Sequence, residues 1–182
     1  AANPSLTYTY SGQVSGQTPG FSGALTTSAG TSSAVGSYDI TQNTLALADN
    51  GTFKASNHSL SYTKATLTIN KANSSNPTLT DTSSTYDGGA HAIGVSGGSG
   101  GTVYYRTSTN NSSWGSWDTT KPSLTDVGTL YVQAYVKGDA NHNDTSATGS
   151  KSITISKRTI TVTAEAKSKT YGEANPSLTY TY

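Results

Sequence analysis

The sequence lacks cysteine and has few charges among its 182 residues. Without cysteine the chain has neither disulfides nor thiolate chemistry. Charged residues make up 12% and the net charge is +1, so there is no electrostatic footprint for nucleic acid or for an anionic membrane. No apolar run approaches the roughly 18 residues of a membrane-spanning helix. We therefore expect neither nucleic-acid binding nor membrane insertion in this segment.

Hydrophobic residues are also scarce, at 32% of the chain. Low hydrophobicity can indicate disorder, but a disordered chain also has high net charge and few aromatic residues. This chain has twelve tyrosines and is rich in threonine. Such β-branched and aromatic side chains favour pleated, half-buried surfaces. The composition predicts an all-β protein.

The nine residues ANPSLTYTY occur at positions 2–10 and again, unchanged, at 174–182, which is 172 positions later. A repeat of this kind is typical of a tandem array, from which the chain would be one window. Shorter matches, such as Leu67–Lys71 with Ile153–Lys157, recur at an offset of 86, half of the long period. The array is most simply two alternating modules of about equal length.

The chain has three parts, each with runs in which apolar and polar residues alternate. Such alternation is the pattern of a half-buried strand. Residues 1–70 form a β module, with strands expected at 3–10, 37–40 and 60–69. Residues 71–156 form a second module, in which Leu130–Val136 is the clearest strand. Residues 157–182 hold another strand, 157–164, followed by the start of the next copy of the first module.

The first module has no lead-in strand of its own, and residues 157–173 carry the strand that it lacks. A β module without one strand exposes an unpaired edge and an apolar groove. We therefore expect residues 157–164 to pair with a unit other than residues 1–70 of the same copy. The expected junction between repeats consists of Ile160, Val162, Ala164, Tyr171, Leu178, Tyr180, Leu6 and Tyr8.

The run TITVTAEAKSKTYGEANPSLTYTY at 159–182 resembles the bacterial repeat modules called MBG domains of the YGX type. The triplet Tyr171-Gly172-Glu173 and the following Asn175–Thr179 carry the resemblance. Residues 71–156 resemble bacterial Ig-like modules more loosely, through Tyr86-Asp87-Gly88, Val127-Gly128 and the closing SITIS. The resemblance implies tandem Ig-like β-sandwich modules, a β-grasp-like first unit being the alternative, in a bacterial surface or adhesin-like protein. It brings no catalytic residues and no cofactor.

Two segments could bind a ligand. Trp114 and Trp117, with Tyr104 and Tyr105 nearby, could stack on a sugar or anchor a protein, or one tryptophan could close the core. The loop holding Asp139, Asn141, Asn143 and Asp144 gathers oxygen ligands that calcium prefers, but it lacks the spacing of a known calcium loop. We expect instead that these side chains form Asx-type turns that fix the backbone of the loop.

Enzymatic chemistry finds little support in the sequence. No nucleophile elbow is present, and His58, His91 and His142 lie on separate segments without metal-ligand spacing. The Gly97–Gly101 run has no following Lys-Ser/Thr and fits a hairpin tip better than a phosphate loop. Lys64 and Lys151 are weak candidates for an internal isopeptide bond, which requires a buried lysine, asparagine and acid together.

We thus expect a non-enzymatic structural repeat of a long extracellular bacterial stalk or fibre. Its partners would be adjacent copies of itself, joined in one polypeptide, which the overlap favours, or by strand addition between subunits. The alternative function is an adhesive module that recognises glycan or host protein through the Trp114/Trp117 loop.

Overall fold

Strands and tight turns build the whole chain, as the threonine- and tyrosine-rich composition predicts. The computed structural model describes residues 2–182. By packing, the chain divides into unit 1, which runs to Ser74 and includes Gly138–Asn143, and unit 2, which comprises Ser75–Lys137 and Asp144–Tyr182. The helical element among the described residues is a single 3-10 turn, η1 (Ala55–Asn57). The all-β prediction is confirmed, and no described helix is long and apolar enough to cross a bilayer.

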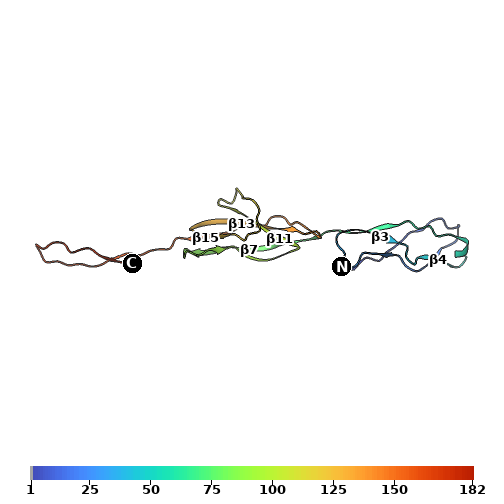
Figure 1. The fold of residues 1–182 in the computed structure, drawn as a ribbon, viewed down its shortest axis with the longest axis horizontal. Helices are drawn as coiled ribbons and strands as arrows, with labels where there is room; N and C mark the ends of the chain where they lie inside the picture. The colour runs from blue at the N-terminus through green and yellow to red at the C-terminus, as the bar shows by residue number, and fades with distance from the viewer. Residues whose placement is uncertain (1) are drawn as a thin grey trace. The chain divides into compact units, whose positions relative to one another are not determined.

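Unit 2 has two facing layers of strands (Figure 1). One layer is a four-stranded sheet in the order β11 (Gly101–Ser108), β13 (Gly128–Gly138), β15 (Lys151–Ser156) and β8 (Thr82–Thr85). The other is the antiparallel pair β7 (Ser75–Thr80) and β10 (Gly94–Ser99). Two short strands, β9 (His91–Ala92) and β12 (Ser123–Leu124), pair beside them. Strand β15 is antiparallel to β13 and parallel to β8, so the four-stranded sheet is mixed.

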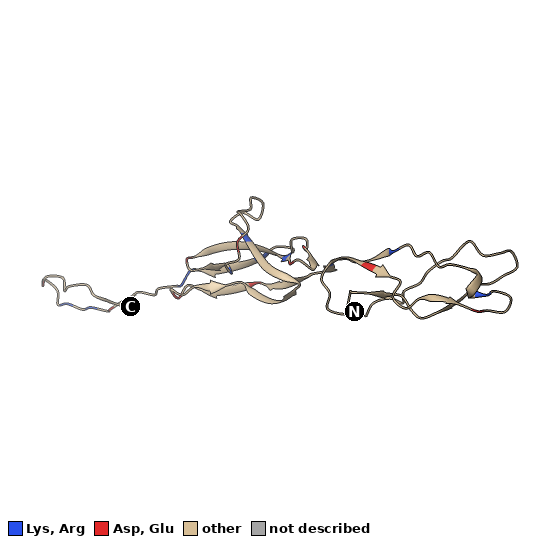
Figure 2. Cartoon of the chain, turned by 45° about the vertical axis from the view of Figure 1, so that its right-hand side comes forward, with Lys and Arg blue, Asp and Glu red and all other residues tan. Residues whose placement is uncertain are grey.

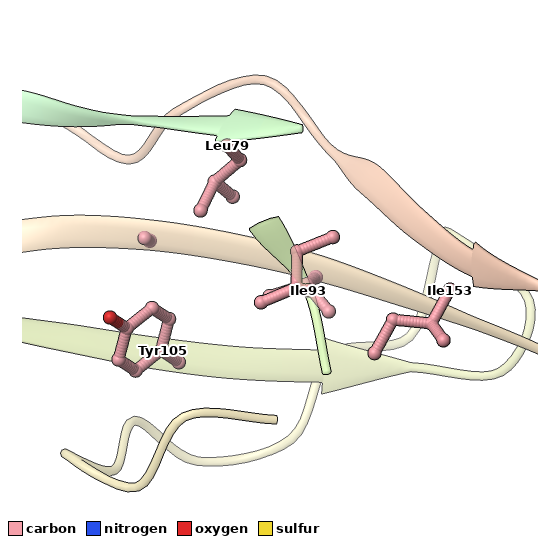
Figure 3. Close-up of a cluster of buried hydrophobic side chains, with 6 residues drawn as sticks. Leu79, Ile93, Tyr105 and Ile153 are labelled. Carbon is pink, nitrogen blue, oxygen red and sulfur yellow. The ribbon is translucent and has the colours of Figure 1, made fainter. Parts of the chain in front are cut away.

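The core of unit 2 follows from the alternation along β13. Val132, Ala134 and Val136 are fully buried, while the residues between them lie on the opposite face. Because successive side chains of a strand point to opposite faces, one run supplies both the core and the outer surface. Leu79, Tyr105 and Ile153 come from three different strands, Ile93 lies between β9 and β10, and all four meet in the same cluster (Figure 3).

Unit 1 contains the three-stranded sheet β2 (Thr26–Thr27), β3 (Gly36–Thr41) and β5 (Ala65–Ile69), and the pair β1 (Gly20–Ser22) and β4 (Ala46–Ala48). Strand β6 (Ala72–Asn73) runs parallel to β14 (His142–Asn143). Gly23 has φ of 76°, and a Cβ there would collide with the carbonyl of Thr44, so the turn after β1 requires glycine. Of the strand expected at 60–69, only the second half forms: β5 begins at Ala65, after Lys64.

The core of unit 1 is thin. Among the described residues, its buried apolar side chains are Ala29, Leu45 and Phe53. The Phe53 ring stacks on His58 with centroids 4.4 Å apart. Strand pairing, expected for residues 3–10, is absent there, and that prediction is wrong. Strand geometry depends on a hydrogen-bonded neighbour, and the described part of unit 1 offers none to this segment.

The last 26 residues form a separate hairpin. Strand β16 (Thr163–Ala164) pairs antiparallel with β17 (Tyr180–Thr181), so that Thr163 faces Thr181 and Ala164 faces Tyr180. Figure 1 shows the two arms side by side, joined by a turn in which Gly172 has φ of 90°. We call residues 160–182 the C-terminal hairpin.

Removal of the Ile93 side chain should lower the stability of unit 2. Ile93 is fully buried, and an isoleucine-to-alanine change at such a site costs about 2–5 kcal/mol in lost burial and cavity formation. Chemical denaturation followed by tryptophan fluorescence measures the loss. Val127→Ala, at a side chain that is 46% exposed, serves as the control and should change stability little. Equal effects of the two changes would contradict the assigned core.

Asp81→Asn should flatten the acid dependence of unit 2 stability. The Asp81 carboxylate accepts hydrogen bonds from the Ser152 amide at 2.7 Å and from Lys151 Nζ at 3.2 Å, and the pKa of Asp81 is lowered, first by the Ser152 bond. A lowered pKa adds stability that is complete above about pH 4 and is lost as pH falls through the lowered value. Urea midpoints measured from pH 7 down to about pH 2 should fall less steeply in the variant. Parallel curves would contradict this role.

Candidate functional site

A groove of about 780 Å³, lined by both polar and apolar side chains, opens in unit 1. Residues 7–13 line it along one wall and residues 58–63 along another. Between them lie apolar side chains from several strands and turns: Phe21, Leu25, Ile40, Leu45, Leu47 and Phe53. We call this feature the unit 1 groove.

Residues 2–10, the first copy of the duplicated stretch, join no sheet, and residues 7–10 line the unit 1 groove. The Tyr8 ring meets Phe21 edge-on at 5.0 Å between centroids, and the Tyr10 ring lies 5.4 Å from the same phenylalanine. Asn3 donates from its amide nitrogen to the carbonyl of Ala29 at 2.6 Å. Leu6 is half-buried. Two of the predicted junction residues, Leu6 and Tyr8, thus lie in this segment, and Tyr8 lines the groove.

The second copy of the stretch has different neighbours. In the C-terminal hairpin, Glu165 donates its backbone N–H to the carbonyl of Thr179 at 3.0 Å. Lys169 Nζ donates to the amide oxygen of Asn175 at 2.6 Å. The Glu165 carboxylate accepts from the Thr179 hydroxyl and from Lys167, and these two bonds lower the pKa of Glu165. Here the repeated sequence is paired with the strand that residues 2–10 lack.

The predicted junction residues of the hairpin are all exposed. Ile160 is 81% exposed, Leu178 86% and Tyr180 63%. Val162, Ala164 and Tyr171 are exposed as well. Continuing the register from Ala164 opposite Tyr180 places Val162 opposite Tyr182, so these four side chains share one face. The hairpin therefore presents an apolar face to solvent.

The two tryptophans lie on the outer face of the four-stranded sheet of unit 2. The guanidinium of Arg106 lies 4.5 Å from the centroid of Trp117 and 5.2 Å from that of Trp114. Arg106 also donates two hydrogen bonds, at 2.9 and 2.7 Å, to the side-chain oxygen of Gln133. The Trp117 ring meets Tyr135 edge-on at 4.6 Å, and Tyr135 in turn lies 5.6 Å from Tyr104. We call this row the aromatic ladder.

Tyr105 does not join the aromatic ladder. It is 8% exposed and belongs to the core cluster, and burial raises the pKa of its hydroxyl. Arg106, Gln133 and Tyr135 also belong to the aromatic ladder, although the sequence did not identify them as candidate binding residues. The alternation of β11 and β13 holds the missing signal, because it places Tyr104 and Arg106 on the face opposite Tyr105.

The candidate calcium-binding residues are engaged in fastening their own loop. Asp139 accepts from the backbone N–H of Asn141 and pairs with His142, each at 2.7 Å, and these bonds lower the pKa of Asp139, the His142 bond foremost. Asn141 accepts from the backbone N–H of Val35 at 2.9 Å, and Asn143 donates to Asn73 at 3.2 Å. Asp144 follows at the start of the next segment, and its interactions also tie it to the protein. In the part of the chain that the structure describes, no three His, Cys, Asp or Glu side chains converge as metal ligands.

The remaining candidate residues form separate local pairs. Lys64 lies 2.7 Å from Asp39, and Lys151 lies 3.2 Å from Asp81, both at the surface with the lysine side chains 67% and 46% exposed. An isopeptide bond needs a buried lysine, so neither position meets that requirement. His91 pairs with Asp87, while His58 stacks on Phe53. Most charged residues lie in the turns and loops between the strands (Figure 2).

One protein-family model matches the chain, in two separate segments. The model for the MBG domain (YGX type) matches residues 1–68 and residues 160–182, together half of the chain. The chain belongs to the MBG domain family. The MBG match covers the unit 1 groove, the C-terminal hairpin and both copies of ANPSLTYTY.

Neither a curated protein nor a solved structure matches the chain. MBG membership indicates a surface-associated module of the repeat type. It is also typical of extracellular or surface proteins. In the sequence, the two MBG segments lie on either side of residues 69–159, which the family model does not match.

Proposed function

We propose that this chain is a structural repeat of a long extracellular bacterial stalk or fibre. MBG modules alternate end to end with the second β module, and residues 157–182 complete the next MBG module. One observation carries the proposal: the same nine residues occur at 2–10, where they join no sheet, and at 174–182, where they form one arm of a paired hairpin.

Repeats that contact only their neighbours make stability a sum of module and junction terms, and reach then grows with repeat number. A single polypeptide is the favoured form, with Tyr182 leading into residue 11 of the next copy. Such a chain needs no disulfide and no metal to hold its modules together, because each junction strand is covalently continuous with both neighbours.

The carboxylates support a structural role over a catalytic one. Asp49 accepts the backbone N–H of Ala55, Asp87 that of Gly89 and Asp118 that of Thr120, each at 2.8 or 2.9 Å. These bonds lower the pKa of each carboxyl group. A lowered pKa keeps a carboxylate ionised and poorly suited to act as an acid near neutrality. We assign the protein no enzymatic activity.

Mechanical stretching of the native protein should give many unfolding events from one molecule. Each event should lengthen the chain by about 3.3–3.6 Å per unfolded residue, and two increments should recur, one for each module type. Single-molecule force spectroscopy on material taken from the bacterial surface makes this measurement. A denaturing gel that places the native material at the mass of a single copy would contradict the one-polypeptide array.

A second candidate function is adhesion through the aromatic ladder, to a glycan or a host protein. The observation that favours it is the position of Trp114 and Trp117 outside the buried core cluster, half-buried on the outer sheet face. Aromatic rings with a nearby arginine are common in binding hot spots. The Arg106 contacts hold the rings in one orientation, which reduces the entropy lost on binding.

The adhesion candidate predicts that Trp114→Ala combined with Trp117→Ala abolishes retention on a glycan or host-matrix array. Unit 2 should remain folded, because neither indole belongs to its core. Array binding and the thermal transition seen by circular dichroism measure the two effects separately. Val127→Ala is the control for an exposed apolar side chain. If the double variant unfolds at the temperature of the array, the tryptophans are structural, and unchanged retention would also refute adhesion through this ladder.

A further inference from the structure

The aromatic ladder extends to a second cation. Lys137 Nζ lies 5.9 Å from the ring centroid of Tyr104, so the row has Arg106 near one end and Lys137 at the other. Neither cation takes part in an ion pair within residues 2–182. Strands β11, β13 and β15 contain no Asp or Glu. This sheet face is therefore positively charged, although the whole chain has a net charge of only +1.

The carboxylates that follow the ladder residues most closely in the sequence are engaged elsewhere. Asp118 accepts the backbone N–H of Thr120 at 2.8 Å, and Asp139 is bound within its own loop. Asp81 pairs with Lys151 of β15, two strands away from β11. The two cations of the ladder thus keep their charges available to a ligand.

Hydrogen-bond donors dominate the polar groups of the ladder. Arg106 uses Nε–H and one Nη2–H on the side-chain oxygen of Gln133, which leaves three guanidinium N–H groups and the Gln133 amide N–H groups to donate. The two indoles and Lys137 can only donate. A ligand that fits this face needs acceptors and negative charge, together with a flat apolar surface that covers the rings.

Backbone groups at the edge of β11 are already paired with the tryptophan loop. Tyr105 and Asp118 exchange backbone hydrogen bonds of 2.7 and 2.8 Å, and Gly115 donates to Thr107 at 2.9 Å. An extended peptide often binds by adding a strand to an open sheet edge, and the loop occupies this part of the edge. The ladder offers rings and side-chain donors instead, which suit the C–H faces and the oxygens of a sugar chain better than a peptide backbone.

The tryptophan loop is also held in one conformation. The amide oxygen of Asn110 accepts the backbone N–H groups of Ser112 and Ser113 at 3.0 and 2.8 Å, and it accepts the Ser108 hydroxyl at 3.0 Å. Rings that are positioned before binding lose less entropy when a ligand arrives.

Resting on adhesion as the function of this face, we propose that the aromatic ladder binds an acidic glycan, a sugar chain that carries carboxylate or sulfate groups. The sugar rings stack on the accessible sides of the aromatic rings. The acidic groups and hydroxyls of the glycan accept hydrogen bonds from Arg106, Lys137 and Gln133. Rings and charges act together, because each alone covers only part of the face.

The experiment measures binding of the full chain to two matched pairs of glycans by biolayer interferometry. The pairs are polygalacturonate with its methyl ester and dextran sulfate with dextran, so that within each pair the sugar chain is the same and the charge differs. The parent should bind at least one acidic member about tenfold or more tightly than its neutral counterpart. Added salt should weaken that binding. Polyglutamate, which is acidic but has no sugar rings, should bind no better than the neutral glycans.

Lys137→Gln should reduce the preference for the acidic member by about three- to tenfold, since it removes one charged donor at an exposed position. Binding of the neutral member should stay the same. Lys157→Gln is the matched control, because it removes the same charge from an exposed residue just after β15, which ends beside the start of β13 while Lys137 lies near the end of β13. This control should behave as the parent. Circular dichroism checks that each variant is folded.

Three results would overturn the proposal: equal binding of the acidic and neutral members, equal loss with Lys137→Gln and Lys157→Gln, or binding of polyglutamate as tight as that of the acidic glycans. The last result would point to an acidic protein as the partner. If only a neutral glycan or a protein binds, and Trp114→Ala with Trp117→Ala abolishes that binding, adhesion stands and the acidic preference is refuted. If the parent binds nothing, adhesion through the ladder fails as well.

Discussion

Strand pairing is the constraint on which the rest of this structure depends. A strand with alternating side chains has one apolar face to cover and backbone groups on both sides to pair. Unit 2 meets both needs from its own chain: β13 lies between β11 and β15, and its inner face is fully buried at Val132, Ala134 and Val136. Unit 1 meets neither need along its groove. Unit 1 has a thin core, and the C-terminal hairpin leaves its apolar side chains exposed.

Hydrogen bonds from backbone N–H groups to carboxylates complement these small cores. Asp81 holds the start of β15 beside β8, and Asp139 fastens the loop before β14. Exposed ion pairs such as Lys64 with Asp39 add little to stability. The carboxylates at turns also accept backbone N–H groups and so hold the turns in one conformation. This explains how so few charged residues serve so many loops.

The sequence was sufficient to predict the all-β class, the family and the strands with the strongest alternation. The Leu130–Val136 run forms the centre of β13, because its pattern and its burial agree. Residues 3–10 have a similar pattern but form no strand, since a pattern specifies a face and cannot supply a neighbour. The sequence predicts Trp114, Trp117 and Tyr104 as binding candidates, but not their contact with Arg106. Alternation along β11 places Arg106 on the outer face, and the tryptophans reach it only after their loop folds back over the sheet.

The duplicated stretch separates local preference from tertiary context more cleanly than any substitution could. Tyr180 lies in a strand and Tyr8 does not, although their nearest eight neighbours in the repeat are identical. The difference must come from the partner, which is present at Thr163–Ala164 and absent beside residues 2–10. An MBG module is therefore defined by the strands that cover each other, and its two halves can lie at distant positions in one sequence.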